Sequence, residues 1–233
     1  FFAWLGLRAL GVAFDRERLC AYMAGGLASA EPADALCAHV LLLRERRLPR
    51  WRGWRRLAGA ALARGRSGDA YGAFRVGLLA DALLPGGAPR CVARRLWRLA
   101  AARVAASAPT PVLAARAVLA ALGGARDGEA SDWMEARRDA GGGYRSAACA
   151  PPDLLATAAA LFAASMAPAR RSEAGGRLRR DLAFVEACWL EDGLFGPTPH
   201  GGRGDAENTF YGLLALGACR KLSGACPAEA GKG

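Results

Sequence analysis

The sequence predicts an all-α fold built from helical hairpins. Two stretches near the C-terminal end, 141–162 and 190–216, share one pattern: a glycine-rich turn with an aromatic residue, a variable loop, an Asp, and a Thr four residues later that opens an apolar helix. No segment alternates Val, Ile or Thr with polar residues well enough to predict a strand. Repeated units of this kind point to stacked helical pairs, each packed on its neighbours.

The pattern extends towards the N-terminus. Aligning Asp153 with Asp205 also aligns Thr157 with Thr209. The corresponding upstream positions, each followed by an apolar segment, are Asp34, Asp69 and Thr110. These five positions lie 35, 41, 43 and 52 residues apart, which is the size of a helical hairpin with its loops.

The first 14 residues are expected to form an inner helix. The segment is apolar, too short to span a bilayer, and has neither a basic leader nor a clear cleavage site. Because it precedes the first outer-type helix, the sequence seen here is expected to enter partway into a hairpin, which indicates a truncated N-terminus.

Between the repeat positions lie outer-type helices, whose apolar residues recur at spacings of three and four, as one buried helix face requires. The expected buried sets are Leu19, Tyr22 and Met23; Val92, Leu96, Leu99 and Val104; and Leu178, Leu182, Val185 and Trp189. Arginine pairs occupy the opposite faces. The helices that follow the repeat positions are apolar nearly all round, so we expect them inside.

An Asp before an apolar run is typical of a helix N-cap, where its carboxylate accepts the first free backbone amides. Such a cap stabilises a helix by about 0.5–2 kcal/mol. Capping is therefore the first interpretation of Asp153 and Asp205, ahead of any chemical role.

Composition fits one large domain, expected over residues 1–224, with a disordered tail at 225–233. Seven cysteines without C-x-x-C spacing predict reduced thiols in a cytoplasmic protein. The net charge of +11 comes almost entirely from arginine. Its densest cluster, 44–56, includes two tryptophans and could bind a polyanion; tryptophans in the core with arginines in water are the favoured interpretation, so nucleic acid is not the expected partner.

Three features together resemble the prenyltransferase and squalene-cyclase repeat family: alternating outer and inner helices, glycine-aromatic turns, and the Asp-x-x-x-Thr helix start. The segments 133–161 and 184–216 are most similar to the last two repeats of protein prenyltransferase β subunits, especially the geranylgeranyltransferase type. The resemblance is strong over 128–222 and weaker upstream. It implies an α/α toroid of about six inner and five outer helices around a central cavity, an α-like helical partner, and prenyl transfer from a prenyl diphosphate to a protein cysteine.

The resemblance also implies a zinc site, whose family ligands are an Asp, a Cys two residues later and a His. The matching positions here are Asp153, Leu155 and Asn208. Leucine cannot bind a metal and neutral Asn is a poor substitute for imidazole, so we expect this zinc site to be lost, with Asp153 as its only matching ligand.

The two cations that the family places against the diphosphate are replaced by Ala147 and Ala150. Arg145 lies nearby and either compensates for them or stays in water. A mixed metal site built from other loop residues is a further geometric option, with the candidate ligands Cys149, Asp153, His200 and Asp205. His39, within an apolar segment, is more simply a core histidine.

The residues expected to line a cavity or to contact substrate are Tyr144, Arg145, Asp153, Thr157, Asn208, Thr209, Phe210 and Tyr211. Three functions follow. The resemblance implies a prenyltransferase β-like protein, with catalysis in question because the zinc and diphosphate residues have changed. A non-catalytic protein that binds an isoprenoid or a protein partner is the alternative, and a polyanion-binding helical repeat is the third.

Overall fold

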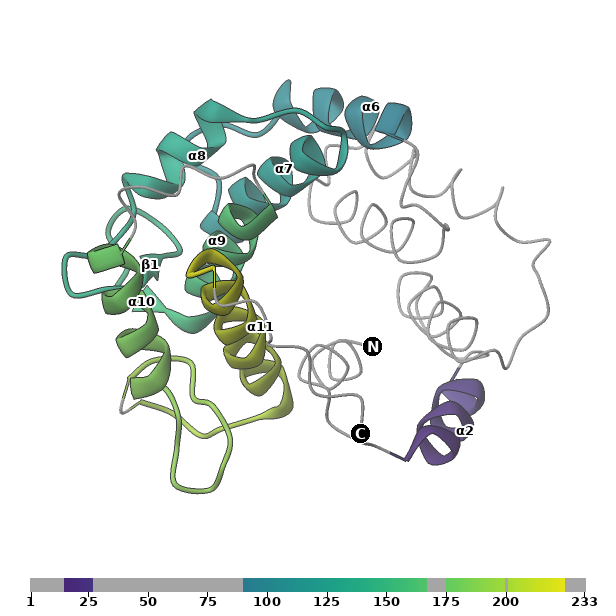
Figure 1. Ribbon diagram of the computed structural model, residues 1–233, viewed down its shortest axis with the longest axis vertical. Helices are drawn as coiled ribbons and strands as arrows, with labels where there is room; N and C mark the ends of the chain where they lie inside the picture. Colours follow the sequence, from purple (N-terminus) through teal and green to yellow (C-terminus); the bar gives the residue numbers. More distant parts are fainter. Residues whose placement is uncertain (1–14, 27–89, 167–174, 200, 225–233) are drawn as a thin grey trace. The chain divides into compact units, whose positions relative to one another are not determined.

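The computed structural model of the 233-residue chain describes residues 15–26, 90–166, 175–199 and 201–224, shown as ribbons in Figure 1. The described helices are α2 (Arg16–Gly26), α6 (Arg90–Ala101), α7 (Thr110–Leu122), α8 (Gly128–Glu135), α9 (Leu154–Met166), α10 (Gly175–Ala187) and α11 (Ala206–Leu222). Within these ranges the predicted all-α class is confirmed. Closure of the helices into a toroid stays a prediction.

Several sequence-based expectations fall outside the described residues. They concern the first helix at 1–14, the repeat starts at Asp34 and Asp69, the core histidine His39, the arginine cluster 44–56, His200, and the tail at 225–233. None of the described helices is long and apolar enough to cross a bilayer.

The chain divides into two compact units, 1–105 with 115–127, and 106–114 with 128–233. Each unit is described by itself, and the single domain predicted over 1–224 stays a prediction.

In the first unit, a buried ion pair joins Arg116 of α7 to Asp127, the residue directly before α8. Asp127 accepts hydrogen bonds from Arg116 Nε and from Trp97 Nε1, both at 2.6 Å. Arg116 Nη1 also donates to the carbonyl of Val104 at 3.0 Å. Removing either charge would leave the other buried without compensation, so this network stabilises the unit only as a whole.

The expected buried faces of the outer-type helices are correct only in part. Leu96 and Val104 are buried, and Val185 is fully buried. In α2, however, Tyr22 is 78% exposed and Cys20 is the buried residue. Spacing alone misplaced Tyr22, because α2 is only weakly amphipathic.

The second unit holds α9 and α11 side by side, with α10 packed against α11 (Figure 1). α9 is largely buried, as the apolar sequence of an inner-type helix predicts. α11 is buried only along one side, at Phe210, Tyr211, Gly212, Ala215, Ala218 and Cys219. Phe195, on the turn after α10, packs on α11 at Gly212, where a Cβ atom would lie 2.5 Å from its ring. Glycine at this position therefore allows the turn to approach the helix closely.

Two short strands are a correction to the strand-free prediction. β1 (Tyr144–Arg145) pairs antiparallel with β2 (Pro152–Asp153), with Tyr144 opposite Asp153. A two-residue strand leaves no alternation in the sequence, so this ladder could not be found from periodicity. The ladder brings the aromatic turn against the start of α9.

Candidate functional site

The predicted site residues lie on two connections that lead into neighbouring helices. The first connection, 138–157, runs from α8 into α9, and the second connection, 189–209, runs from α10 into α11. The backbone hydrogen bonds of their glycine turns correspond at a shift of 51 residues, for example Asp139 N to the Gly143 carbonyl and Leu190 N to the Leu194 carbonyl. The two connections are therefore copies of one structural unit, as the sequence pattern predicts.

In the first connection, Thr157 fastens the aromatic turn to the helix start. Its hydroxyl donates to the Asp153 carbonyl at 2.7 Å and accepts from the Tyr144 backbone amide at 2.9 Å. The Asp153 carboxylate accepts from the Ala156 amide at 2.7 Å. Asp153 thus caps α9. The side chains of the two predicted site residues, Asp153 and Thr157, both hydrogen-bond to backbone groups at the start of this helix.

The second connection repeats this arrangement. Thr209 Oγ1 donates to the Asp205 carbonyl at 2.7 Å and accepts from the Phe195 amide at 3.2 Å. Asp205 is the N-cap of α11 and accepts from the Asn208 amide at 2.6 Å. The interpretation of both repeat aspartates as caps is therefore confirmed.

Asn208, at the position of the family's zinc-binding histidine, is turned towards its own helix cap. Its side-chain Nδ2 donates to Asp205 Oδ2 at 3.0 Å. The neighbouring rings of Phe210 and Tyr211 are both buried, with centroids 5.2 Å apart, and the Tyr211 hydroxyl lies 3.4 Å from a Glu207 carboxylate oxygen. The Asn208 side chain is thus hydrogen-bonded to the N-cap residue of its own helix.

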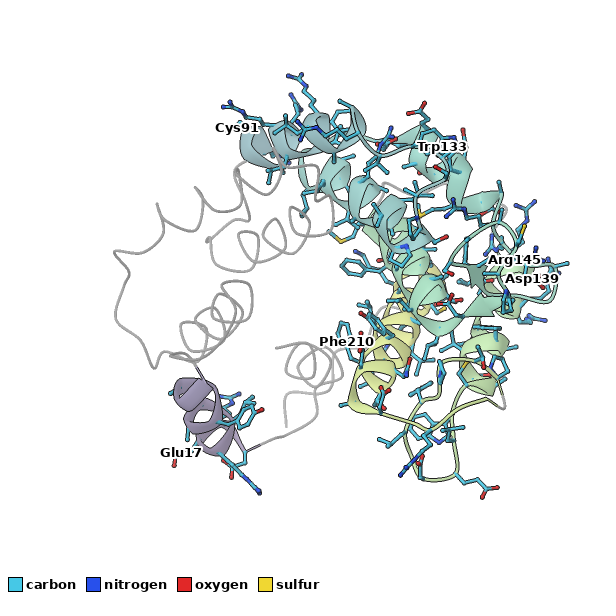
Figure 2. All side chains as sticks on the ribbon, turned by 180° about the vertical axis from the view of Figure 1, so that it is seen from behind. Glu17, Cys91, Trp133, Asp139, Arg145 and Phe210 are labelled. Atoms are coloured by element: carbon cyan, nitrogen blue, oxygen red, sulfur yellow. The ribbon has the colours of Figure 1, made fainter. Side chains whose placement is uncertain are left out.

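Arg145 forms an ion pair with Asp139 across the glycine turn. Its Nη2 lies 2.5 Å from Asp139 Oδ2, and Figure 2 shows the two side chains next to each other. This hydrogen bond, together with the Gly141 amide, lowers the pKa of Asp139. Arg145 therefore has a local partner, and a role towards a diphosphate stays a prediction.

Behind the first turn lies a buried charge network that sequence analysis did not find. Asp181 of α10 is fully buried, forms an ion pair with Arg138, and accepts from the Gly143 amide at 3.0 Å. Burial opposes the charge of Arg138, but the hydrogen bond to Asp181 and the charges of Tyr144, Asp181 and Glu135 together outweigh it and raise the pKa of Arg138. The guanidinium also lies 5.2 Å from the ring centre of Tyr144. Burial raises the pKa of the Tyr144 hydroxyl.

Arg137 is a second buried cation that the sequence analysis missed. Its Nη1 donates to the carbonyls of Ala108 and Ser146 at 2.6 and 3.0 Å, and its Nη2 donates to that of Ala106 at 2.5 Å. Burial lowers its pKa. The position of an arginine directly before the turn gave no signal of burial, because arginine is usually exposed.

Around Asp153, burial outweighs the hydrogen bonds to its carboxylate and raises the pKa of that carboxyl. Cys188, at the end of α10, is fully buried; burial, with a contribution from the charge of Asp153, raises its pKa to about 12. A thiol with this pKa stays protonated at neutral pH, so Cys188 is a poor nucleophile in this state.

One face of α9 differs from the rest of the helix. Four apolar residues at successive spacings of four, three and four are all half-buried: Leu155, Ala159, Phe162 and Met166. Most other α9 residues are buried, with Ala164 the exposed exception. The partly accessible stripe, called here the α9 apolar face, therefore begins at the position where the family has its cysteine ligand.

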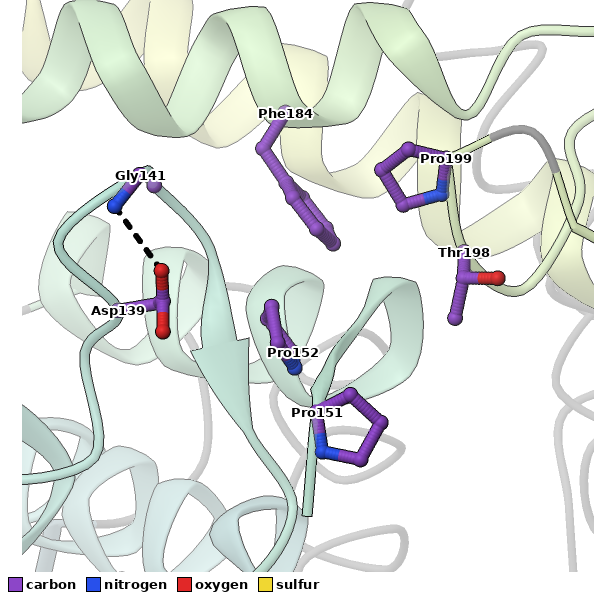
Figure 3. Close-up of a pocket in the computed structure, with 8 residues that line it drawn as sticks. Asp139, Gly141, Pro151, Pro152, Phe184, Thr198 and Pro199 are labelled. Carbon is purple, nitrogen blue, oxygen red and sulfur yellow. Dashed lines mark hydrogen bonds between the residues drawn. The ribbon is translucent and has the colours of Figure 1, made fainter.

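A separate shallow pocket of about 410 Å³ lies between the two connections (Figure 3). It is lined by Asp139, Gly141, Gly142, Pro151, Pro152, Phe184, Thr198 and Pro199. Its lining is mostly proline, glycine and one aromatic ring, and its carboxylate is the one paired with Arg145. The one carboxylate among these lining residues is thus already held in an ion pair.

In the described ranges, no group of three or more His, Cys, Asp and Glu side chains converges in a geometry that could hold a metal ion. Of the mixed ligand set considered from sequence, Asp153 and Asp205 are helix caps and Cys149 is exposed. His200 lies outside the described residues. Among the family's zinc positions, Asp153 alone carries a metal-binding side chain.

No protein-family model, no curated protein and no solved structure matches this chain.

Proposed function

We propose that this chain is a protein prenyltransferase β-like protein that binds an isoprenoid chain and does not transfer it through the family's zinc site. The observation that carries this proposal is the α9 apolar face, Leu155, Ala159, Phe162 and Met166, which is half-buried on an otherwise buried helix. An apolar stripe left partly open to water gains about 0.8 kcal/mol for each methylene that covers it.

The kinship with the prenyltransferase repeat is supported by the two connections. They share backbone hydrogen bonds, an Asp cap and a Thr hydroxyl bridge despite little side-chain identity. A common backbone design with diverged side chains is what a repeat protein of this family would keep. An α/α toroid, an α-like helical partner and a cytoplasmic location belong to the same proposal.

The absence of transfer is supported by the residues at the reacting end. Leu155 offers no donor atom, and Asn208 carries an amide where the resembled family has a histidine ring, with its Nδ2 donating to Asp205. Zinc in this chemistry holds the substrate thiol as thiolate, and without it the thiol remains a weak nucleophile. Binding of the apolar chain needs none of these groups.

Binding is tested by titrating the full chain with a fluorescent geranylgeranyl probe. The Phe162→Ser and Leu155→Asn variants are expected to weaken binding about tenfold or more, since each removes apolar contact. Ala164→Asn, on the same helix but outside the α9 apolar face, is the matched control and is expected to bind as the wild type does. Circular dichroism checks that all three variants fold.

Transfer is tested separately with labelled geranylgeranyl diphosphate, a cysteine-containing acceptor protein and added zinc, both with the chain alone and with a helical α-type subunit. We expect no transfer and no zinc retained after dialysis. Zinc-dependent transfer would contradict the non-catalytic part of the proposal, and equal probe binding by wild type and Phe162→Ser would contradict the binding part.

A further inference from the structure

The exposed face of α6 carries a row of positive charge. Cys91, Arg94, Arg95 and Arg98 follow each other at i, i+3, i+4 and i+7, and all four are exposed. These spacings place them on one stripe of the helix. We call this stripe the α6 basic face; Cys91, labelled in Figure 2, marks its beginning.

Within the residues that the structure describes, the arginines of the α6 basic face form no ion pair. No carboxylate in the described part of the chain pairs with Arg94, Arg95 or Arg98, although other arginines there are paired, such as Arg177 with Glu135 at 2.8 Å. Among the described residues, Arg94 Nη2 donates to the Gly123 carbonyl at 3.2 Å. Like charges at these spacings repel one another and destabilise the helix, and an anionic partner would relieve this repulsion.

A membrane surface fits this face poorly. The apolar side of α6 is turned into the protein, with Ala93, Leu96 and Ala100 all buried. No large apolar side chain remains on the α6 basic face to enter a lipid interface. Single-stranded nucleic acid fits no better, because Trp97 is half-buried and its Nε1 is bound to Asp127, so it offers no base-stacking surface.

The spacing fits an acidic helix. Arg94 and Arg98 are four residues apart, which is about 6 Å along the helix axis. Carboxylates four residues apart on a second helix have this same rise, and guanidinium groups bind carboxylates through two parallel hydrogen bonds.

We propose that the α6 basic face docks an acidic α-helical segment of a partner protein, with carboxylates four residues apart facing Arg94, Arg95 and Arg98. This site is separate from the α9 apolar face and does not depend on isoprenoid binding.

The exposed thiol of Cys91 gives a local measurement on the unaltered chain. The probe is an alanine-based helical peptide of about four turns with Glu at every fourth position, and its control carries Gln in place of Glu. Alkylation by iodoacetamide is followed by mass spectrometry. The acidic peptide is expected to slow alkylation of Cys91 about threefold or more by covering it, while Cys149, exposed and outside α6, reacts at an unchanged rate.

Two matched charge reversals test the residues. Arg95→Glu with Arg98→Glu is expected to abolish the protection of Cys91, while Arg179→Glu with Arg203→Glu, which changes the net charge equally at exposed positions elsewhere, preserves it. Protection should also fall as salt rises. Both variants keep the buried side of α6 intact.

Three results would overturn the proposal. They are no protection of Cys91 by the acidic peptide, equal protection by a peptide with the same glutamates in scrambled order, and stronger protection by a short DNA duplex or by phosphatidylserine vesicles than by the acidic helix.

Discussion

The first and second connections use one backbone design with different side-chain chemistry. At the position before the turn, the first connection has Arg138, which pairs with the buried Asp181, and the second has Trp189, which stacks edge-on against Phe195 with ring centres 4.8 Å apart. Trp189 is 52% exposed. The comparison shows that Asp, Thr and glycine specify the turn, whereas the contact behind it is free to vary.

The largest expected difference between the two connections is the loss of stability when the contact behind each turn is removed. Asp181→Ala would leave Arg138 charged and largely buried, at a cost of about 3–5 kcal/mol in the free energy of unfolding. Trp189→Ala removes a half-exposed ring and should cost about 1 kcal/mol. Urea denaturation of both variants measures the difference. Equal losses would show that the two contacts have equivalent weight.

Substitution of glycine is expected to give the second-largest difference in stability between the two connections. Gly142 and its counterpart Gly193 both have positive φ, 106° and 81°. A Cβ at Gly142 would lie 2.3 Å from the Arg180 carbonyl oxygen, and one at Gly193 meets nothing within 4 Å. Gly142→Ala is therefore expected to cost about 3 kcal/mol and Gly193→Ala about 1 kcal/mol. Melting temperatures that shift alike would contradict this.

The threonine bridges give a smaller contrast. Thr157 is fully buried and its bond to the Tyr144 amide is 2.9 Å, whereas Thr209 is half-buried with a 3.2 Å bond to the Phe195 amide. Valine keeps the shape and removes the acceptor. We expect about 2 kcal/mol for Thr157→Val and about 1 kcal/mol for Thr209→Val, because the amide is left unpaired. Amide hydrogen exchange at Tyr144 and Phe195 reports the loss directly.

The smallest effect concerns the pH dependence of the caps. Since burial raises the pKa of Asp153, the native state holds this proton more tightly than the unfolded chain does. The contribution of Asp153 to stability therefore falls as pH rises from about 4 through the native pKa. Asp153→Asn still caps the helix but does not ionise, so its stability relative to wild type should improve across that range.

Asp205→Asn is the control for the pH series, because Asp205 is exposed and its carboxylate stays in water. The same thermal melts from pH 4 to neutral are used for both variants. A flat difference between Asp153→Asn and wild type would show that burial of this carboxylate does not favour its protonated form.

Local rules predicted the repeat and its caps. The alignment of Asp153 with Asp205 and of Thr157 with Thr209 rests on residues within four positions of each other, and such contacts are encoded locally. The pair of Arg138 and Asp181 joins residues 43 positions apart. Nothing in the local sequence of either residue indicates its partner.

The limited reach of local sequence patterns also explains why some residues expected to be buried are exposed. Trp189 was expected to be buried from its spacing with Val185, but α10 ends at Ala187 and the helical period no longer applies beyond it. The α9 apolar face could not be recognised from sequence either, because α9 is apolar nearly all round. Its distinction from the buried faces depends on which neighbours pack against it.

Photo-crosslinking with a benzophenone-labelled isoprenoid, mapped by peptide mass spectrometry, tests the central claim most directly. Isoprenoid binding at the α9 apolar face predicts adducts on the peptide that contains Leu155 and Phe162, removed by competition with unlabelled geranylgeraniol. Adducts elsewhere, or adducts that unlabelled isoprenoid does not compete away, would contradict isoprenoid binding at this face.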